Sequence, residues 1–150
     1  MRRDEYYLRF AINQAKKAAE KKEVPVGAVI VRDDIIVATG HNRRESKRSP
    51  IAHAETEVIQ IAAAKSGDWR LSDCELFVTL EPCAMCAGAI ISGRIKRLVF
   101  GAFDPAAGCM GSVVDLSLLF SEHPIEVLGG VLQQECQRLL TDFFGQRRNL

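Results

Sequence analysis

The amino-acid sequence predicts an α/β protein, a three-layer α/β/α sandwich with a mixed five-stranded sheet, formed by a single domain over residues 1–150. Segments rich in β-branched residues alternate with segments whose apolar residues recur at helical spacing. One strand, helix and strand follow each other within about 25 residues, as in a βαβ unit with parallel strands. With 150 residues and 47% hydrophobic content, the chain can bury a core without disulfides.

The first half of the chain predicts two helices and a β-hairpin. The expected elements are a helix over 5–22, strands over 28–31 and 35–39, a loop over 40–52 and a helix over 53–65. Small and apolar residues recur at helical spacing in both helices, which indicates one buried face on each. Pro25 ends the first helix, Asp33 and Asp34 form the hairpin turn, and Gly67 ends the second helix.

The second half predicts a βαβ unit, a long loop, and a closing strand and helix. The expected elements are strands over 75–80, 97–101 and 125–128, and helices over 82–91, 113–119 and about 132–143. A loop rich in Gly, Ala and Pro covers 102–112. The last helix carries its apolar residues on one stripe, so it should pack on the sheet.

Charge and hydropathy exclude some classes of protein. No apolar run approaches the roughly 18 residues of a membrane span, and the first residues lack the pattern of a secretory signal, so we expect a cytoplasmic protein. The formal net charge is +1, but residues 1–50 hold 12 Lys and Arg against 7 Asp and Glu. A polyanionic partner would therefore be bound locally, by the first third of the chain.

The five cysteines, an odd number, argue against a disulfide framework and suggest thiols or metal ligands. Cys83 and Cys86 lie three residues apart at the start of a predicted helix, so both sulfurs can reach one ion. Pro82 suits the first turn of that helix, where backbone amides favour the thiolate that binds metal. Among three histidines, His53 is the best candidate for a third ligand.

Three protein ligands leave one position of a tetrahedral zinc open to water, which is the arrangement of catalytic zinc sites. Glu55 follows His53 by two residues and would not share the metal on a regular helix. If His53 caps the helix, Glu55 can face the water and serve as a proton shuttle. Two other interpretations remain open, a surface His-x-Glu unrelated to metal and a redox Cys-x-x-Cys pair.

The combination His-x-Glu and Pro-Cys-x-x-Cys resembles the signature of the zinc nucleobase deaminases. From about Tyr6 to Arg148, the chain is similar to the bacterial tRNA-specific adenosine deaminases of the cytidine deaminase-like superfamily. The further matching stretches are 23–28, 42–43, 79–83, 92–94, 99–102, 104–105, 108–112, 142–144 and 147–148. The resemblance implies a cytidine deaminase-like fold.

The resemblance also implies an activity, a cofactor and partners. It implies a homodimeric hydrolase with one Zn²⁺ per chain, held by His53, Cys83 and Cys86. The reaction would convert the wobble adenosine of a tRNA anticodon, with tRNA-Arg the expected substrate, to inosine by zinc-activated water, with Glu55 as catalytic residue. The implied contacts to the anticodon stem-loop come from Asn42, Asp104, Phe144, Arg147 and Arg148.

The chain departs from many of these relatives at two positions. Ala106 stands where they have Lys, and Glu122 stands where they have Asn. Both departures concern RNA contacts and leave the metal ligands and Glu55 unaffected. Two rival functions remain, a deaminase of free guanine or cytosine on the same scaffold, and a non-catalytic zinc module that binds RNA or protein.

Overall fold

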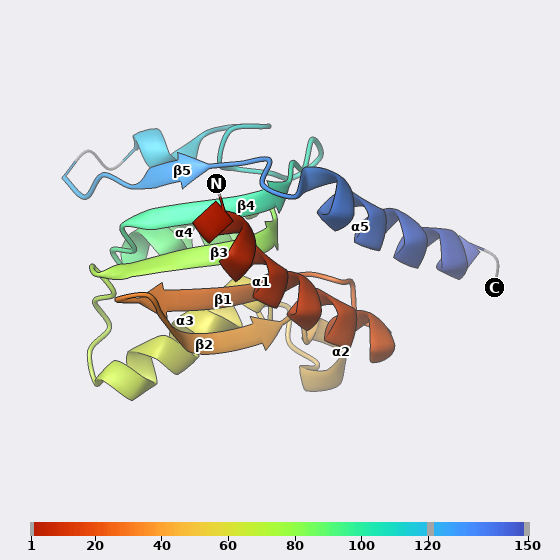
Figure 1. The fold of residues 1–150 in the computed structure, drawn as a ribbon, viewed down its shortest axis with the longest axis horizontal. Helices are drawn as coiled ribbons and strands as arrows, with labels where there is room; N and C mark the ends of the chain where they lie inside the picture. Colours follow the sequence, from red (N-terminus) through yellow and green to blue (C-terminus); the bar gives the residue numbers. More distant parts are fainter. Residues whose placement is uncertain (1, 120–121, 149–150) are drawn as a thin grey trace.

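The computed structural model of the protein describes residues 2–119 and 122–148 (Figure 1). The helices are α1 (Arg2–Glu20), α2 (Arg44–Lys47), α3 (Ala54–Ser66), α4 (Ala84–Ser92) and α5 (Gln133–Arg148), with a 3₁₀ turn, η1, at Leu116–Leu118. The strands are β1 (Gly27–Arg32), β2 (Ile35–His41), β3 (Cys74–Leu80), β4 (Arg97–Ala102) and β5 (Glu126–Leu128). None of the described helices combines the length and apolarity of a transmembrane segment.

The described strands form one mixed sheet in the order β2-β1-β3-β4-β5. β1 pairs antiparallel with β2 and β3, whereas β3, β4 and β5 are parallel to one another. The predicted βαβ unit is therefore β3, α4 and β4. Because β3 and β4 are parallel, their carboxyl ends lie at the same edge of the sheet, and α3 and α4 begin there (Figure 1).

Helices cover both faces of the sheet, which confirms the predicted three-layer α/β/α sandwich (Figure 1). Along β1, Val29 and Val31 pack in the core beneath α1 and α5, while Ala28 and Ile30 pack in the core beneath α3 and α4. This alternation is what a strand buried on both faces requires. It explains why β1 is an apolar run, while β3, also buried on both faces, contains the two buried polar residues Glu75 and Thr79.

Two expectations differ from the structure. The predicted loop over 40–52 contains the short helix α2, and the expected helix over 113–119 is only the 3₁₀ turn η1. The first difference depends on a carboxylate that is distant in the chain. The carboxylate of Glu23, 22 residues before Glu45 in the chain, accepts the backbone N–H groups of Glu45 and Ser46 and so holds the first turn of α2. Such a distant partner leaves no local pattern in the sequence.

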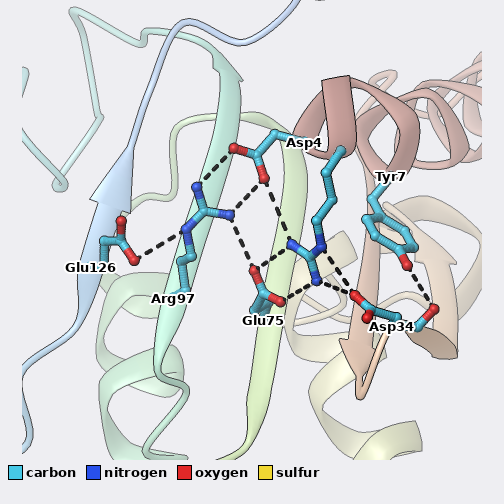
Figure 2. Close-up of polar contacts among 7 residues, drawn as sticks. Asp4, Tyr7, Asp34, Glu75, Arg97 and Glu126 are labelled. Atoms are coloured by element: carbon cyan, nitrogen blue, oxygen red, sulfur yellow. Dashed lines mark hydrogen bonds and ion pairs between the residues drawn. The ribbon is translucent and has the colours of Figure 1, made fainter. Parts of the chain in front are cut away.

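A network of ion pairs ties several elements together at the amino end of β3 and β4 (Figure 2). Its members are Arg3, Asp4, Tyr7, Asp34, Glu75, Arg97 and Glu126. Glu75, at the start of β3, lies 2.7 Å from Arg3 and 3.1 Å from Arg97. Burial alone would raise the pKa of the Glu75 carboxyl, but the hydrogen bonds from both arginines hold it below its usual value.

Replacing Glu75 with Gln should destabilise the protein, because two arginines lose their shared carboxylate. We expect a loss of about 2 kcal/mol, or a fall in Tm of roughly 4–8 °C. The stabilisation exists where the carboxylate is ionised in both states and is lost as pH falls through the lowered folded pKa, below 4.5. The parent and E75Q should therefore converge in acid, whereas D73N, which breaks an exposed ion pair with Arg32, should change little.

Candidate active site

The candidate metal ligands come from the first turns of two helices. His53 occupies the N-cap of α3 in an extended conformation, with φ −83° and ψ 160°. Cys83 occupies the N-cap of α4, and Cys86 lies in the first turn of that helix. Pro82 precedes the cap and cannot donate a backbone hydrogen bond, so it suits the approach to the helix. His53 thus caps α3, which is the position from which the sequence predicts that Glu55 can face the water of a zinc site.

The structure brings His53, Cys83 and Cys86 together as a three-residue cluster. The Nδ1 atom of His53 lies 3.7 Å from Sγ of Cys83 and 3.4 Å from Sγ of Cys86. The three ligand atoms all lie within 4.8 Å of one another. A tetrahedral zinc with bonds of about 2.0–2.3 Å would separate such atoms by roughly 3.5–3.8 Å, so the donors fit that ion.

The electrostatics of the cluster favour a thiolate. Hydrogen bonds from Cys86 and His53 lower the pKa of the Cys83 thiol to about 3. The bond to Cys83 raises the pKa of His53 in turn, and the pKa of Cys86 rises because its thiol donates to Cys83 and is buried. A sulfur that is deprotonated at neutral pH is the form that binds metal, so the cluster is prepared for a cation.

Glu55 lies in the first turn of α3, with only 4% of its surface exposed. Burial raises the pKa of its carboxyl to about 7. A carboxyl with a pKa near neutrality can both accept and release a proton at pH 7, which is what a general acid and base requires. Glu55 lines the same cavity as His53 and Cys83.

The cluster opens onto a cavity of about 200 Å³ at the carboxyl edge of β3. Its lining is Val24, Val26, Asn42, Arg44, His53, Ala54, Glu55, Leu80, Glu81, Cys83, Asp104 and Ala107. Sites for drug-sized ligands usually have volumes of about 300–1,000 Å³. A cavity of this size therefore suits one flat base better than a whole nucleotide.

Asn42 and Asp104 both line this cavity, and both side chains also hold their own loops. The amide of Asn42 donates to the carbonyl of Val24, and its oxygen accepts the N–H of Arg44. The carboxylate of Asp104 accepts the N–H groups of Ala106 and Ala107 through one oxygen, Oδ1. Both side chains therefore stabilise the turns in which they lie. A contact to a substrate would use the donors and acceptors that these hydrogen bonds leave over.

Phe144, on α5, lies outside this cavity. It is 44% exposed and lines a neighbouring groove of about 590 Å³, which shares Asp104, Val24 and Leu80 with the cavity. Its ring packs edge-on against Phe143. Arg147 and Arg148 end α5, and their side chains are outside the described part of the chain.

The basic loop before α3 divides into paired and unpaired residues. Lys47 lies 2.8 Å from the buried carboxylate of Glu57, and Arg43 lies 3.9 Å from it. Arg44 and Arg48 are exposed and form no ion pair with the described side chains. Arg44 also lines the cavity. The unpaired cations are therefore the better candidates for contacts to phosphate.

Two buried carboxylates near the cavity went unrecognised as site residues in the sequence. Glu81 accepts hydrogen bonds from the loop over 104–112. Glu23 holds the loop on the other side, as described above. In both cases burial would raise the pKa, but the donated hydrogen bonds hold it below its usual value. In the sequence, the signal for Glu23 and Glu81 is only that each is a charged residue close to the end of an apolar stretch predicted to form a strand.

Comparison with known proteins matches the whole chain. The family model described as MafB19-like deaminase matches residues 2–148. The tRNA-specific adenosine deaminase of Bacillus subtilis is 50% identical over 151 residues, which cover 99% of this chain and 92% of the relative. That of Haemophilus influenzae is 44% identical over 147 residues, which cover 97% and 85%.

Solved structures agree with the fold. A structure from a study of A-to-I editing by tRNA:A34 deaminases at the wobble position has a TM-score of 0.85 and 39% identity, over 90% of this chain and 99% of that one. The guanine deaminase from Nitrosomonas europaea has a TM-score of 0.83 at 24% identity, over 93% and 83% of the two chains. At that identity the second likeness concerns the fold alone.

Replacing Cys86 with Ala should remove most of the bound metal, because two ligands hold a divalent ion far more weakly than three. Elemental analysis of the purified protein would measure the metal per chain, and we expect a fall to less than about a tenth of the parent value. Cys136, a buried thiol far along the chain on α5, provides the matched control. Metal retained in C86A, or lost equally in C136A, would contradict the ligand assignment.

Proposed function

This chain belongs to the tRNA-specific adenosine deaminases within the MafB19-like deaminase family, and from that membership we infer that it is a hydrolase that deaminates adenosine in tRNA. We propose that its substrate is the wobble adenosine of an anticodon stem-loop, that of tRNA-Arg, and that the product is inosine. The observation that carries the proposal is the arrangement of a His and two Cys around a cavity with a buried carboxylate of raised pKa.

The proposed cofactor is one zinc ion per chain, held by His53, Cys83 and Cys86. The donor set of one imidazole and two sulfurs is typical of catalytic zinc, and the donor separations fit its tetrahedral geometry. When bound by three protein ligands, zinc supplies a water with a pKa near 7, which is available as a nucleophile at neutral pH. The protein then has to orient the base and move protons.

Glu55 would move the protons. Its carboxylate would accept a proton from the attacking water and deliver it to the adenine ring nitrogen. It would then take the second proton of that water, from the hydroxyl now on C6, and deliver it to the leaving ammonia. Burial keeps its pKa near 7, so neither direction of transfer is strongly uphill at neutral pH. The narrow cavity accepts the base, and Asn42 and Asp104, at its mouth, would hold the sugar and backbone of the flipped nucleotide.

The RNA around the target base would lie on the rim of the cavity. Anticodon bases are already exposed, so extruding one costs less than it would in a duplex. Arg44 and Arg48 are free to pair with phosphates, and we propose the same for Arg147 and Arg148 at the end of α5. Phe144, exposed in the neighbouring groove, can stack on a flanking base.

We further propose that the protein is a single-domain homodimer that works in the cytoplasm. Val113, Val114, Leu118 and Leu119 are exposed apolar residues in and around η1, which packs against α4. A second copy of the chain would cover this apolar surface. The dimer would then bury apolar residues next to the helix that carries both cysteines.

Activity on an anticodon stem-loop tests the substrate. A stem-loop with adenosine at the wobble position should be deaminated at least about a hundredfold faster than free adenosine, guanine or cytidine, because contacts to the flanking RNA provide binding energy. Inosine is read by nucleoside analysis, and a stem-loop with guanosine at that position serves as the control. Comparable rates on free guanine or cytidine would favour the rival, a small-molecule deaminase on the same scaffold.

The E55Q variant tests whether the chain is an enzyme or a non-catalytic zinc module. We expect the deamination rate to fall by about 10²–10⁴-fold, because the amide cannot exchange protons, while zinc stays near one per chain. Glu57 is a buried carboxylate two residues further along α3, outside the cavity, and it offers the control E57Q, which should retain turnover. Unchanged turnover in E55Q would remove the proposed shuttle.

A further inference from the structure

Glu81 is a buried carboxylate that none of the steps above uses. It directly follows β3, immediately before Pro82, and is 2% exposed. Its Oε1 atom accepts the backbone N–H of Asp104 at 3.0 Å. Its Oε2 atom accepts the N–H groups of Met110 and Ser112, each at 3.0 Å, and the Ser112 hydroxyl donates to Oε1. Four donors from one loop therefore converge on a single side chain.

The loop also passes directly over the carboxylate at Gly108. A Cβ atom at that position would lie 2.3 Å from Cδ of Glu81 and 2.6 Å from the carbonyl oxygen of Asp104, closer than any side chain could tolerate. Two backbone bonds complete the attachment, from Gly108 to Asp104 and from Cys109 to Pro82, both 2.9 Å. The path of the loop over 104–112 is thus set by Glu81 and by the chain directly after it.

Only a carboxylate suits this position. An ionised carboxyl group removed from water is costly unless hydrogen bonds replace its hydration, and here four donors do so. A glutamine at the same place would offer one accepting oxygen, and its NH₂ group would face backbone donors. Glutamine would therefore release one side of the loop while leaving the volume of the side chain unchanged.

We propose that Glu81 is a positioning residue, which fixes the loop over 104–112 and thereby sets Asp104 at the mouth of the cavity. The cavity is lined by Glu81, Asp104 and Ala107 together, so a loosened loop changes the shape of the entrance. Glu81 acts through Asp104 and touches no reacting atom. The inference rests on the proposed function for its kinetic consequence, but the attachment itself is independent of the substrate.

The test compares E81Q with E75Q. Both replace a buried carboxylate at an end of β3, Glu81 directly after the strand and Glu75 near its start, roughly 20 Å away. Amide hydrogen exchange should accelerate at least about tenfold at Asp104, Met110 and Ser112 in E81Q and stay unchanged there in E75Q. S112A, which removes one exposed donor, should fold normally and show a smaller acceleration at the same amides.

Steady-state kinetics on the anticodon stem-loop provide the second measurement. KM should rise about tenfold in E81Q with kcat reduced less than threefold, and E75Q should match the parent in both. The double variant E81Q/D104N should have the KM of D104N within about twofold, because the two residues act as one unit.

Unchanged amide exchange in both E81Q and S112A would overturn the attachment. If the rise in KM of the double variant E81Q/D104N equals the product of the two single-variant effects, the positioning role is overturned. Glu81 would then be a general contributor to stability. If the parent protein does not deaminate the stem-loop, the proposed function fails, and the exchange measurement still decides whether Glu81 holds the loop. The two failures are therefore distinguishable.

Discussion

The site depends on two helices that begin at one edge of the sheet. α3 and α4 lie on the same face, and their first turns meet beyond the carboxyl end of β3. This places His53 within 3.7 Å of both cysteine sulfurs, although about thirty residues of chain separate them. Parallel pairing of β3 and β4 requires a crossover, and α4 is that crossover. The topology of the sheet therefore brings the candidate metal ligands together.

Glu55 and Glu81 line the cavity and Glu23 directly precedes its lining residue Val24, and the hydrogen bonds of these three buried carboxylates set the charge of each. Glu23 and Glu81 accept several backbone N–H groups, which hold their pKa below the usual value, so they remain charged anchors. For Glu55 burial outweighs the hydrogen bonds it receives, and its pKa rises to about 7. The same type of side chain thus stays ionised or has a pKa near neutrality, depending on the number of donors around it.

Local patterns in the sequence were sufficient for much of the fold and for the centre of the site. A metal cluster was predicted from the spacing of Cys83 and Cys86, with His53 as the best of the three histidines for a third ligand. The structure brings these three residues together. The strands and long helices followed from apolar periodicity. The short helix α2 and the support of the loop over 104–112 could not be predicted, because each depends on a carboxylate, Glu23 or Glu81, that is distant in the chain. Long-range hydrogen bonds leave no period in a sequence.

The way the loop over 104–112 is held has a consequence for how this protein can change over evolutionary time. Glu81 accepts hydrogen bonds from backbone N–H groups of the loop. Ala106 donates its own backbone N–H to Asp104. Its methyl group has no part in shaping the loop. Mutation can therefore exchange Ala106 for a long cation, or the reverse, without refolding the entrance. Such an exchange would alter the charge on the exposed side of the loop while the cluster of His53, Cys83 and Cys86 stays unchanged.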